Sequence, residues 1–237
     1  MKKKVIVLSL GGSQIIPDDV NYRYLNDFKD VLLKNKKNYK FIIVCGGGSL
    51  ARKYIKAIEF SKQNEKFQSL AGISATRTNA RFMNYFFGID PEQGIPHTMD
   101  AVKNYIKKMD IIFCGALEYK PHQTSDSTSA EIAKQFKTEF VNLTDVKGLH
   151  DKNPKEYKDA KFIPEITWEN FNKLANKIKF HPGQHFVLDQ TAAKMILKNK
   201  TPTYIIESPK ELDNLLNGKK FVGTRIDTET NLRLIKK

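Results

Sequence analysis

The sequence is poor in cysteine, which limits how the fold can be stabilised. Only Cys45 and Cys114 occur among 237 residues, and each ends an apolar segment beside a glycine. These are positions for small buried residues, so the pattern excludes a disulfide framework and a cysteine-based metal cluster. Histidine offers no replacement, because a Pro-Gly pair separates His181 from His185 and breaks any shared helical face. We expect no protein-built metal site.

Long apolar runs are also missing. No segment approaches the roughly 18 residues that a membrane-spanning helix needs. Residues 1–13 carry basic charge and a short apolar run, but they lack the length and the small-residue cleavage site of a signal peptide. The sequence therefore predicts a cytoplasmic protein without a membrane partner.

Several familiar motifs are absent. The chain contains neither a Walker A pattern nor G-x-G-x-x-G, which disfavours P-loop and Rossmann nucleotide sites. It also has no G-x-S-x-G nucleophile elbow. Acidic residues are in deficit, with 26 Asp+Glu against 40 Lys+Arg and a formal charge of +14. Lysines are spread along the whole chain without regularly spaced aromatics, so a Lys-rich surface that also attracts anionic substrates is the favoured interpretation; a nucleic-acid binder is the lesser alternative.

What the sequence does contain is a glycine turn between a strand and a helix. Residues 41–45 are an apolar run, Gly46–Gly48 follow, and residues 50–58 repeat apolar positions at helical spacing. Glycines allow a ligand to approach the backbone, and the helix start offers unpaired N–H groups. Arg52 lies one turn into the helix, within reach of a phosphate. The pattern favours phosphate binding over a plain strand-to-helix turn.

A second glycine turn, Gly11–Ser13, follows an apolar strand predicted over residues 4–10. Strands and helices alternate from there onward. Further strands are predicted at 110–114, 140–143, 203–206 and 220–226. Helices are predicted at 21–37, 66–87, 99–107, 128–136, 168–174, from 189 and at 209–216. The alternation indicates an α/β fold in which a mostly parallel central sheet lies between two helical layers, as one domain over residues 1–237.

Ligands of such folds bind beyond the carboxyl ends of the strands. Four polar or glycine-rich strand ends would share that edge: Gly11–Ser13, Gly46–Gly48, Gly115–Asp126 and Thr144–Asp145. Within the predicted helix 66–87, Arg77 and Asn79 lie within one turn and could face one ligand; an exposed polar face is the equal alternative. Residues 128–131 have a capping-box pattern, which predicts a helix start near Thr128.

Five segments together resemble the amino-acid kinase family, and within it the archaeal-type UMP kinases, over nearly the full chain. They are Ser9–Ser13, Gly46–Tyr54, Thr76–Asn79, Thr144–Pro154 and Asp189–Lys194. The second is similar to the family's internal glycine motif and is the most specific match. The resemblance implies an amino-acid kinase-like sandwich, with an acceptor part at roughly residues 1–140 and an ATP part at roughly 141–237.

The implied activity is transfer of the γ-phosphoryl group of ATP to UMP, giving UDP, with Mg²⁺ and a hexamer built as a trimer of dimers. Relatives imply catalytic roles for Arg52, Asp126, Asp189 and Lys194, with Asp126 arranging cations around the phosphates. The implied ATP-binding residues are Ser9, Gly11, Gly12, Ser13, Gly48, Arg52, Thr144, Asp145, His150 and Asn153. The implied UMP-binding residues are Gly47, Ser69, Arg77, Asn79, Gly115, Lys120, Pro121, Thr124 and Asp126. No residue is assigned as a metal ligand.

The chain departs from the family pattern at specific positions. Many relatives carry Lys where this chain has Ser9, and an acidic residue where it has Ser69. The acceptor loop has Gly115-Ala116 and Pro121-His122 where the family has Gly-Gly and Pro-Gly. His150 and Asn153 replace the family's Tyr and Asp but keep hydrogen-bonding ability. The alternatives are a kinase for another small acceptor, such as an amino-acid carboxylate, carbamate or isoprenyl phosphate, and a nucleotide- or oxyanion-binding protein without turnover.

Overall fold

A computed structural model describes residues 3–90, 94–121, 123–177 and 188–227. His181 and His185 lie outside these described residues. The core of this part is a seven-stranded sheet in the order β3-β2-β1-β4-β8-β9-β7. Its strands are β1 Lys4–Leu10, β2 Tyr39–Cys45, β3 Ile111–Cys114, β4 Phe140–Leu143, β7 Glu165–Ile166, β8 Thr203–Ile206 and β9 Gly223–Ile226. A small second sheet pairs β5 Leu149–His150 with β6 Phe162–Ile163.

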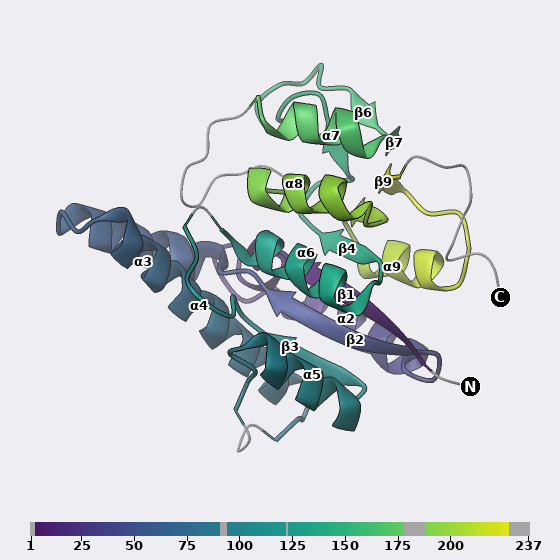
Figure 1. Cartoon of the computed structure of the whole chain (residues 1–237), viewed down its shortest axis with the longest axis horizontal. Coiled ribbons are helices and arrows are strands. Elements are labelled where there is room, and N and C mark those ends of the chain that lie inside the picture. Colours follow the sequence, from purple (N-terminus) through teal and green to yellow (C-terminus); the bar gives the residue numbers. More distant parts are fainter. Residues whose placement is uncertain (1–2, 91–93, 122, 178–187, 228–237) are drawn as a thin grey trace.

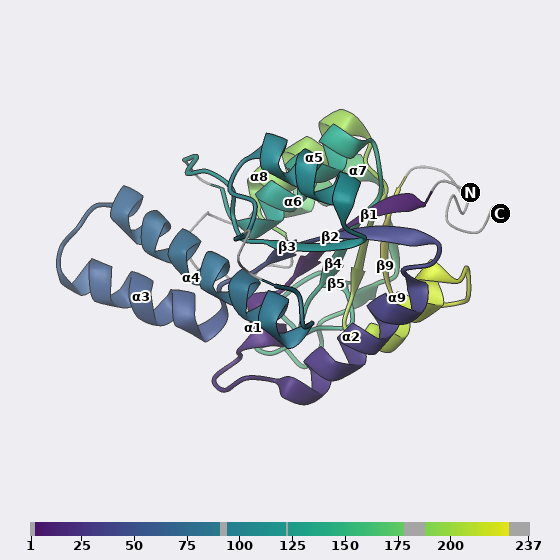
Figure 2. The same ribbon diagram turned by 90° about the horizontal axis from the view of Figure 1, so that it is seen from below.

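Helices cover both faces of the main sheet, which confirms the predicted three-layer α/β/α arrangement (Figures 1 and 2). One layer contains α1 Gly12–Ile15, α2 Tyr22–Asn35, α4 Glu65–Phe86 and α9 Pro209–Leu216. The other contains α5 Met99–Lys108, α6 Ser125–Phe136, α7 Trp168–Ala175 and α8 Gln190–Asn199. The period-2 geometry of a strand splits β1 between two apolar cores: Ile6, Leu8 and Leu10 pack into one, and Val7 into the other.

Strand register brings the glycine-rich ends together. In the main sheet of the described residues, β1, β2, β3, β4 and β8 run parallel to one another; β9 pairs antiparallel with β8, and β7 runs parallel to β9. Leu10 at the end of β1 is opposite Cys45 on one side and Leu143 on the other. The chain builds outward from β1 to β3 and then returns to the other side of β1 at β4. Ligands of open α/β sheets bind at such a switch in strand order.

The α3 Gly48–Phe60 and α4 helices form a hairpin that projects from the body of the molecule (Figure 2). Only Ser49 of α3 is buried, whereas α4 buries residues near its C-terminal half, where it meets the sheet. Of the apolar positions predicted at helical spacing along α3, Leu50 and Ile58 are partly buried and Tyr54 is 46% exposed. None of the described helices has the length and apolar character needed to cross a membrane.

Two local predictions were wrong at one end of an element. The helix expected from Thr128 begins at Ser125, because Thr124 is the N-cap and accepts a hydrogen bond from the Asp126 amide. The last strand covers only Gly223–Ile226 of the predicted 220–226. The Gly11–Ser13 turn continues directly into one helical turn, α1. The short strands β5, β6 and β7 were not predicted, since two-residue strands have no readable period.

Candidate active site

The two glycine turns touch each other through their backbones. A Cβ atom added to Gly12 would lie 1.9 Å from the Gly48 amide nitrogen, and one added to Gly46 would lie 2.4 Å from the Gly12 nitrogen. Gly48 also has a φ of +60°, which only glycine adopts at low cost. These glycines are therefore required for the close contact between the two turns.

Four backbone N–H groups at this contact have no partner. Those of Gly12, Ser13, Gly47 and Gly48 make no hydrogen bond to any residue in the part of the chain that the structure describes. Gly12 and Ser13 are the first two residues of α1, Gly47 is the N-cap of α3, and Gly48 is the first residue of α3. Unpaired N–H groups at helix starts bind anions, and two adjacent sets suit two adjoining phosphates.

Ser9 and Asp126 meet beside these groups. The Ser9 hydroxyl donates a 2.8 Å hydrogen bond to Asp126 Oδ1, linking the fully buried end of β1 to the first turn of α6. Ser9 faces α6 because it follows Val7 by two residues along the strand. Burial raises the pKa of Asp126 to about 7, and the nearby Asp189 carboxylate adds to the increase; the Ser9 hydrogen bond opposes it.

Asp189 joins the starts of two helices. It is 2% exposed and caps α8 through a 2.8 Å bond from the Ala192 amide. It also accepts bonds from the hydroxyls of Thr124, at 2.6 Å, and Ser127, at 2.7 Å. All of these contacts are internal, so Asp189 fixes α6 against α8 and thereby places Asp126.

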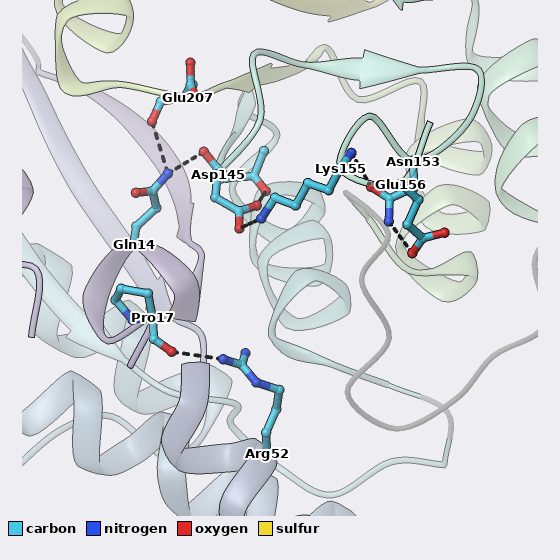
Figure 3. A network of polar contacts seen from close by, with 9 residues as sticks. Gln14, Pro17, Arg52, Asp145, Asn153, Lys155, Glu156 and Glu207 are labelled. Atoms are coloured by element: carbon cyan, nitrogen blue, oxygen red, sulfur yellow. Dashed lines mark hydrogen bonds and ion pairs between the residues drawn. The ribbon is translucent and has the colours of Figure 1, made fainter. Parts of the chain in front are cut away.

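The predicted ATP side lies at the ends of β4 and β8. Gln14 is 5% exposed and donates from α1 to the carbonyl oxygens of Thr144 and Glu207, the latter at 3.2 Å (Figure 3). Lys155 reaches across a loop to form an ion pair with Asp145, which lowers the pKa of that carboxyl below its usual value against the opposing effect of burial. The Gly11 amide donates to Leu143 O at 2.9 Å and closes this edge.

The remaining predicted ATP residues lie farther along the same segment. The His150 ring is half-buried, contacts Gly148 O through Nδ1 at 3.1 Å, and lies 5.6 Å from the Phe162 ring. Asn153 uses its side-chain amide on Glu156, at 2.7 Å (Figure 3). Both side chains therefore contact residues of their own segment, 148–162.

The predicted UMP residues fall into two groups. Arg77, Asn79 and Gly115 meet where α4 crosses the ends of β2 and β3: Asn79 donates to Gly46 O, and Arg77 donates to Ala116 O. Thr124 and Asp126 lie at the start of α6. The others are more peripheral. Ser69 is on α4 toward the projecting tip, Pro121 is exposed, and Lys120 forms an ion pair with Glu131 at 2.7 Å.

The two predicted cationic residues, Arg52 and Lys194, differ in exposure and in hydrogen bonding. Arg52 is partly buried as a residue, and its guanidinium donates an exposed hydrogen bond to Pro17 O at 3.0 Å, beside the first glycine turn (Figure 3). Lys194 is exposed on α8, five residues after Asp189, and forms no ion pair or hydrogen bond within the described ranges. Its ammonium is therefore available to a ligand.

Sequence reasoning missed Gln14, Ser127 and Lys155. Gln14 lies just past the first glycine turn, but a buried amide has no sequence signal of its own. Ser127 follows Asp126 directly, yet its bond to Asp189 spans 62 positions. Lys155 was one of many lysines, and only the loop conformation distinguishes it.

The model for the amino acid kinase family matches residues 4–207 of the chain. A match over this much of the sequence shows that the chain belongs to that family. Uridylate kinase from Thermoplasma volcanium is 31% identical over 94% of this chain and 97% of its own length, and that from Methanobrevibacter smithii is 30% identical over 93% and 98%. The crystal structure of uridylate kinase from Archaeoglobus fulgidus superposes with a TM-score of 0.79, at 28% identity, covering 93% of this chain and 99% of that one.

Proposed function

We propose that this chain is a UMP kinase that transfers the γ-phosphoryl group of ATP to UMP, giving UDP for pyrimidine nucleotide synthesis. The observation that carries the proposal is the set of four unpaired N–H groups on two touching glycine turns, beside Ser9 and Asp126. Phosphoryl transfer requires alignment and positive potential around the transferred group rather than covalent chemistry from the protein. Relatives named uridylate kinase direct the proposal to UMP.

Each half of the site would hold one nucleotide. Thr144, Asp145, His150 and Asn153 would contact the nucleoside of ATP, and the loop from Gly115 to Thr124 would enclose UMP. The N–H groups of Gly12 and Gly48 would bind the phosphates where the two glycine turns touch. Arg52 and Lys194 would place positive charge beside the transferred phosphoryl group. This division corresponds to an acceptor part at roughly residues 1–140 and an ATP part at roughly 141–237 of one domain.

Magnesium would enter with ATP. No group of three potential metal-ligating side chains occurs in the described ranges, and Asp126 is the partly exposed carboxylate at the phosphate junction. One carboxylate plus substrate phosphates is a common way in which proteins hold Mg²⁺, so the residues fit the ion. When bound, Mg²⁺ would neutralise the charge of the phosphates. Asp126 would orient the ion and its water, and Ser9 would hold Asp126 in place.

Assembly and location belong to the same proposal. The α3–α4 hairpin exposes large apolar side chains, which favours burial against other copies as a hexamer. They are Tyr54, Phe60, Phe67 and Leu70. We place the protein in the cytoplasm, where ATP and UMP are available.

The direct test is ADP formation from ATP and Mg²⁺ with a panel of nucleoside monophosphates. We expect UMP to exceed CMP, AMP and GMP by at least tenfold in kcat/KM. Ser69 is neutral where relatives have an acidic residue, and this favours the alternative of another small acceptor. The panel should therefore include carbamate, acidic amino acids and isopentenyl phosphate. Equal ADP formation with and without UMP would defeat the proposal.

A further inference from the structure

Side chains of α4 form hydrogen bonds to two segments of the predicted acceptor side: the second glycine turn, Gly46–Gly48, and the loop that begins at Gly115. The Thr76 hydroxyl accepts a 3.0 Å hydrogen bond from the Ala116 amide, and it is itself oriented by donating to Ile73 O at 2.7 Å. The Asn79 amide donates to Gly46 O at 2.7 Å. Thr76 and Asn79 are 7% and 4% exposed, so water cannot readily replace either bond.

Arg77 completes this set from the same helical turn. Its Nε donates to Ala116 O at 3.2 Å, and one terminal nitrogen donates to Leu117 O. The loop is also pressed against the helix, because a Cβ atom on Gly115 would lie 2.6 Å from the Thr76 hydroxyl oxygen. We call Thr76, Arg77 and Asn79 the α4 brace. Its members bind the ends of β2 and β3, and hence fix the distance between the second glycine turn and the acceptor loop.

The predicted ATP side has a corresponding set of contacts, made by Gln14 and Tyr24, which we call the Gln14 brace. Gln14 donates to the carbonyl oxygens of Thr144 and Glu207, and the Tyr24 hydroxyl donates to the same Glu207 oxygen at 3.2 Å. Gln14 is 5% exposed and makes both of its bonds to main-chain atoms, as Figure 3 shows. These contacts fix the ends of β4 and β8, whereas the α4 brace fixes the ends of β2 and β3.

We propose that Thr76 and Gln14 are positioning residues that set the affinity for one substrate each: Thr76 for the phosphoryl acceptor and Gln14 for ATP. Thr76 acts through the Ala116 amide and Gln14 through the Thr144 and Glu207 carbonyls, without touching a nucleotide. Arg77 and Asn79 act with Thr76, through loop backbone. The inference rests on the proposed function in taking the acceptor to lie between residues 46–48 and 115–121.

The test for the acceptor half uses a matched pair of substitutions on one helix. Thr76→Val keeps the shape of the side chain but leaves the Ala116 amide without a partner. We expect the KM for UMP to rise about tenfold, the effect of one unpaired buried donor, with the KM for ATP within twofold of wild type. Thr78→Val is the control, because the Thr78 hydroxyl donates to Ser74 O on the exposed side of α4. Thr76→Ser retains the hydroxyl and should restore wild-type KM.

Gln14→Met gives the opposite pattern. It removes both hydrogen bonds at similar volume, so the KM for ATP should rise about tenfold while the KM for UMP stays within twofold. If either variant raises both KM values equally, or neither, the assignment of one substrate to each brace is overturned. Should Thr76→Val fail to fold, Arg77→Lys removes the paired bonds to Ala116 O and Leu117 O and makes the same prediction.

Hydrogen exchange separates this inference from the proposed function. In the ligand-free protein, amides of residues 115–117 should exchange at least tenfold faster in Thr76→Val than in wild type, and those of residues 144–146 should be unchanged. In Gln14→Met, the amides of residues 144–146 should exchange faster than in wild type, and those of residues 115–117 should be unchanged. A wild-type protein that forms no ADP with UMP defeats the proposed function, yet this exchange pattern would still support the braces. Unchanged exchange at 115–117 in Thr76→Val would overturn them, whatever the activity.

Discussion

At the scale of single residues, the hydrogen bond between Ser9 and Asp126 affects the charge balance of the candidate site. Ser9 supplies a neutral hydroxyl, so the β1 side chain that contacts Asp126 carries no positive charge to offset the carboxylate. The pKa of Asp126 is raised from 3.8 to about 7. Part of the positive charge needed for catalysis must therefore come from elsewhere in the site, and Arg52 and Lys194 are the predicted sources.

Asp126 should make the stability of the protein depend on pH. Its folded-state pKa lies above the unfolded value, so the folded protein binds the proton more tightly. The free energy of unfolding therefore falls as pH rises from about 4 to about 7. Asp126→Asn removes this loss and should stabilise the protein at pH 8 by about 1–2 kcal/mol, discounted for partial exposure, with little effect at pH 4. Urea unfolding in magnesium-free buffer measures it. Asp100→Asn, at an exposed carboxylate, is the control substitution, and an equal gain at both pH values in Asp126→Asn would contradict the prediction.

Arg52 and Lys194 should contribute mainly to the transition state. Arg52→Ala should lower kcat by about 10²-fold or more, since its charge acts on the transferred phosphoryl group, and Lys194→Met should act similarly. Arg52→Lys should recover only part of the loss, because an ammonium lacks the planar fork of donors. Steady-state kinetics with saturating ATP and UMP measures this. The adjacent exposed Lys53→Ala is the control, and turnover within twofold of wild type in Arg52→Ala would remove Arg52 from the mechanism.

The residues at this site were predicted, but their contacts were not. Ser9 and Asp126 are 117 positions apart, and their hydrogen bond depends on how α6 crosses the sheet. Motif spacing is local, so it identified the glycine turns and Asp189. It could not identify Gln14 or Lys155, whose partners lie at least ten positions away.

At the scale of helices and strands, the close contact between the starts of α1 and α3 explains why glycine is needed at positions 12 and 48. Gly12→Ala should destabilise the protein by more than about 2 kcal/mol, since its Cβ atom would lie 1.9 Å from the Gly48 nitrogen and one turn must move. Gly72→Ala is the control within α4: its Cβ atom would meet Ile55 at an ordinary 3.4 Å, and it should be neutral or stabilising by up to about 1 kcal/mol. Urea unfolding of the two variants tests this. A Gly12→Ala protein as stable as Gly72→Ala would show that the turns do not touch in solution.

Element boundaries failed where distant contacts override local signals. The capping-box pattern at residues 128–131 was plausible alone, but Asp189 binds Thr124 and Ser127 and extends α6 toward its N-terminus. Elements with long apolar periods, such as α2, α9 and β2, were predicted within a few residues. Local periodicity is sufficient where the element packs on one core face, and insufficient where a buried carboxylate joins two helices.

At the scale of the whole molecule, alternating strands and helices predicted the layers but could not give the order of the strands. That order depends on which side of β1 the chain takes after β3, and no local pattern records this choice. The projecting hairpin was equally unpredictable, because apolar residues at helical spacing usually face a core of the same chain. In α3 none of these apolar positions is fully buried, and Tyr54 is 46% exposed.

The exposed hairpin tip should hold copies of the chain together. Phe60 is 90% and Phe67 48% exposed, and burying both rings against another copy would remove a large apolar area from water. The double variant Phe60→Glu, Phe67→Glu should therefore lower the molar mass measured by size exclusion with light scattering, since two charges per chain would have to be buried in the contact. Circular dichroism should be unchanged, because both side chains are already largely in solvent. Val222→Glu, at a residue 52% exposed beyond α9, should leave the mass as in wild type. If the double variant keeps the wild-type mass, the assembly uses another surface, and the hairpin's apolar residues need a different partner.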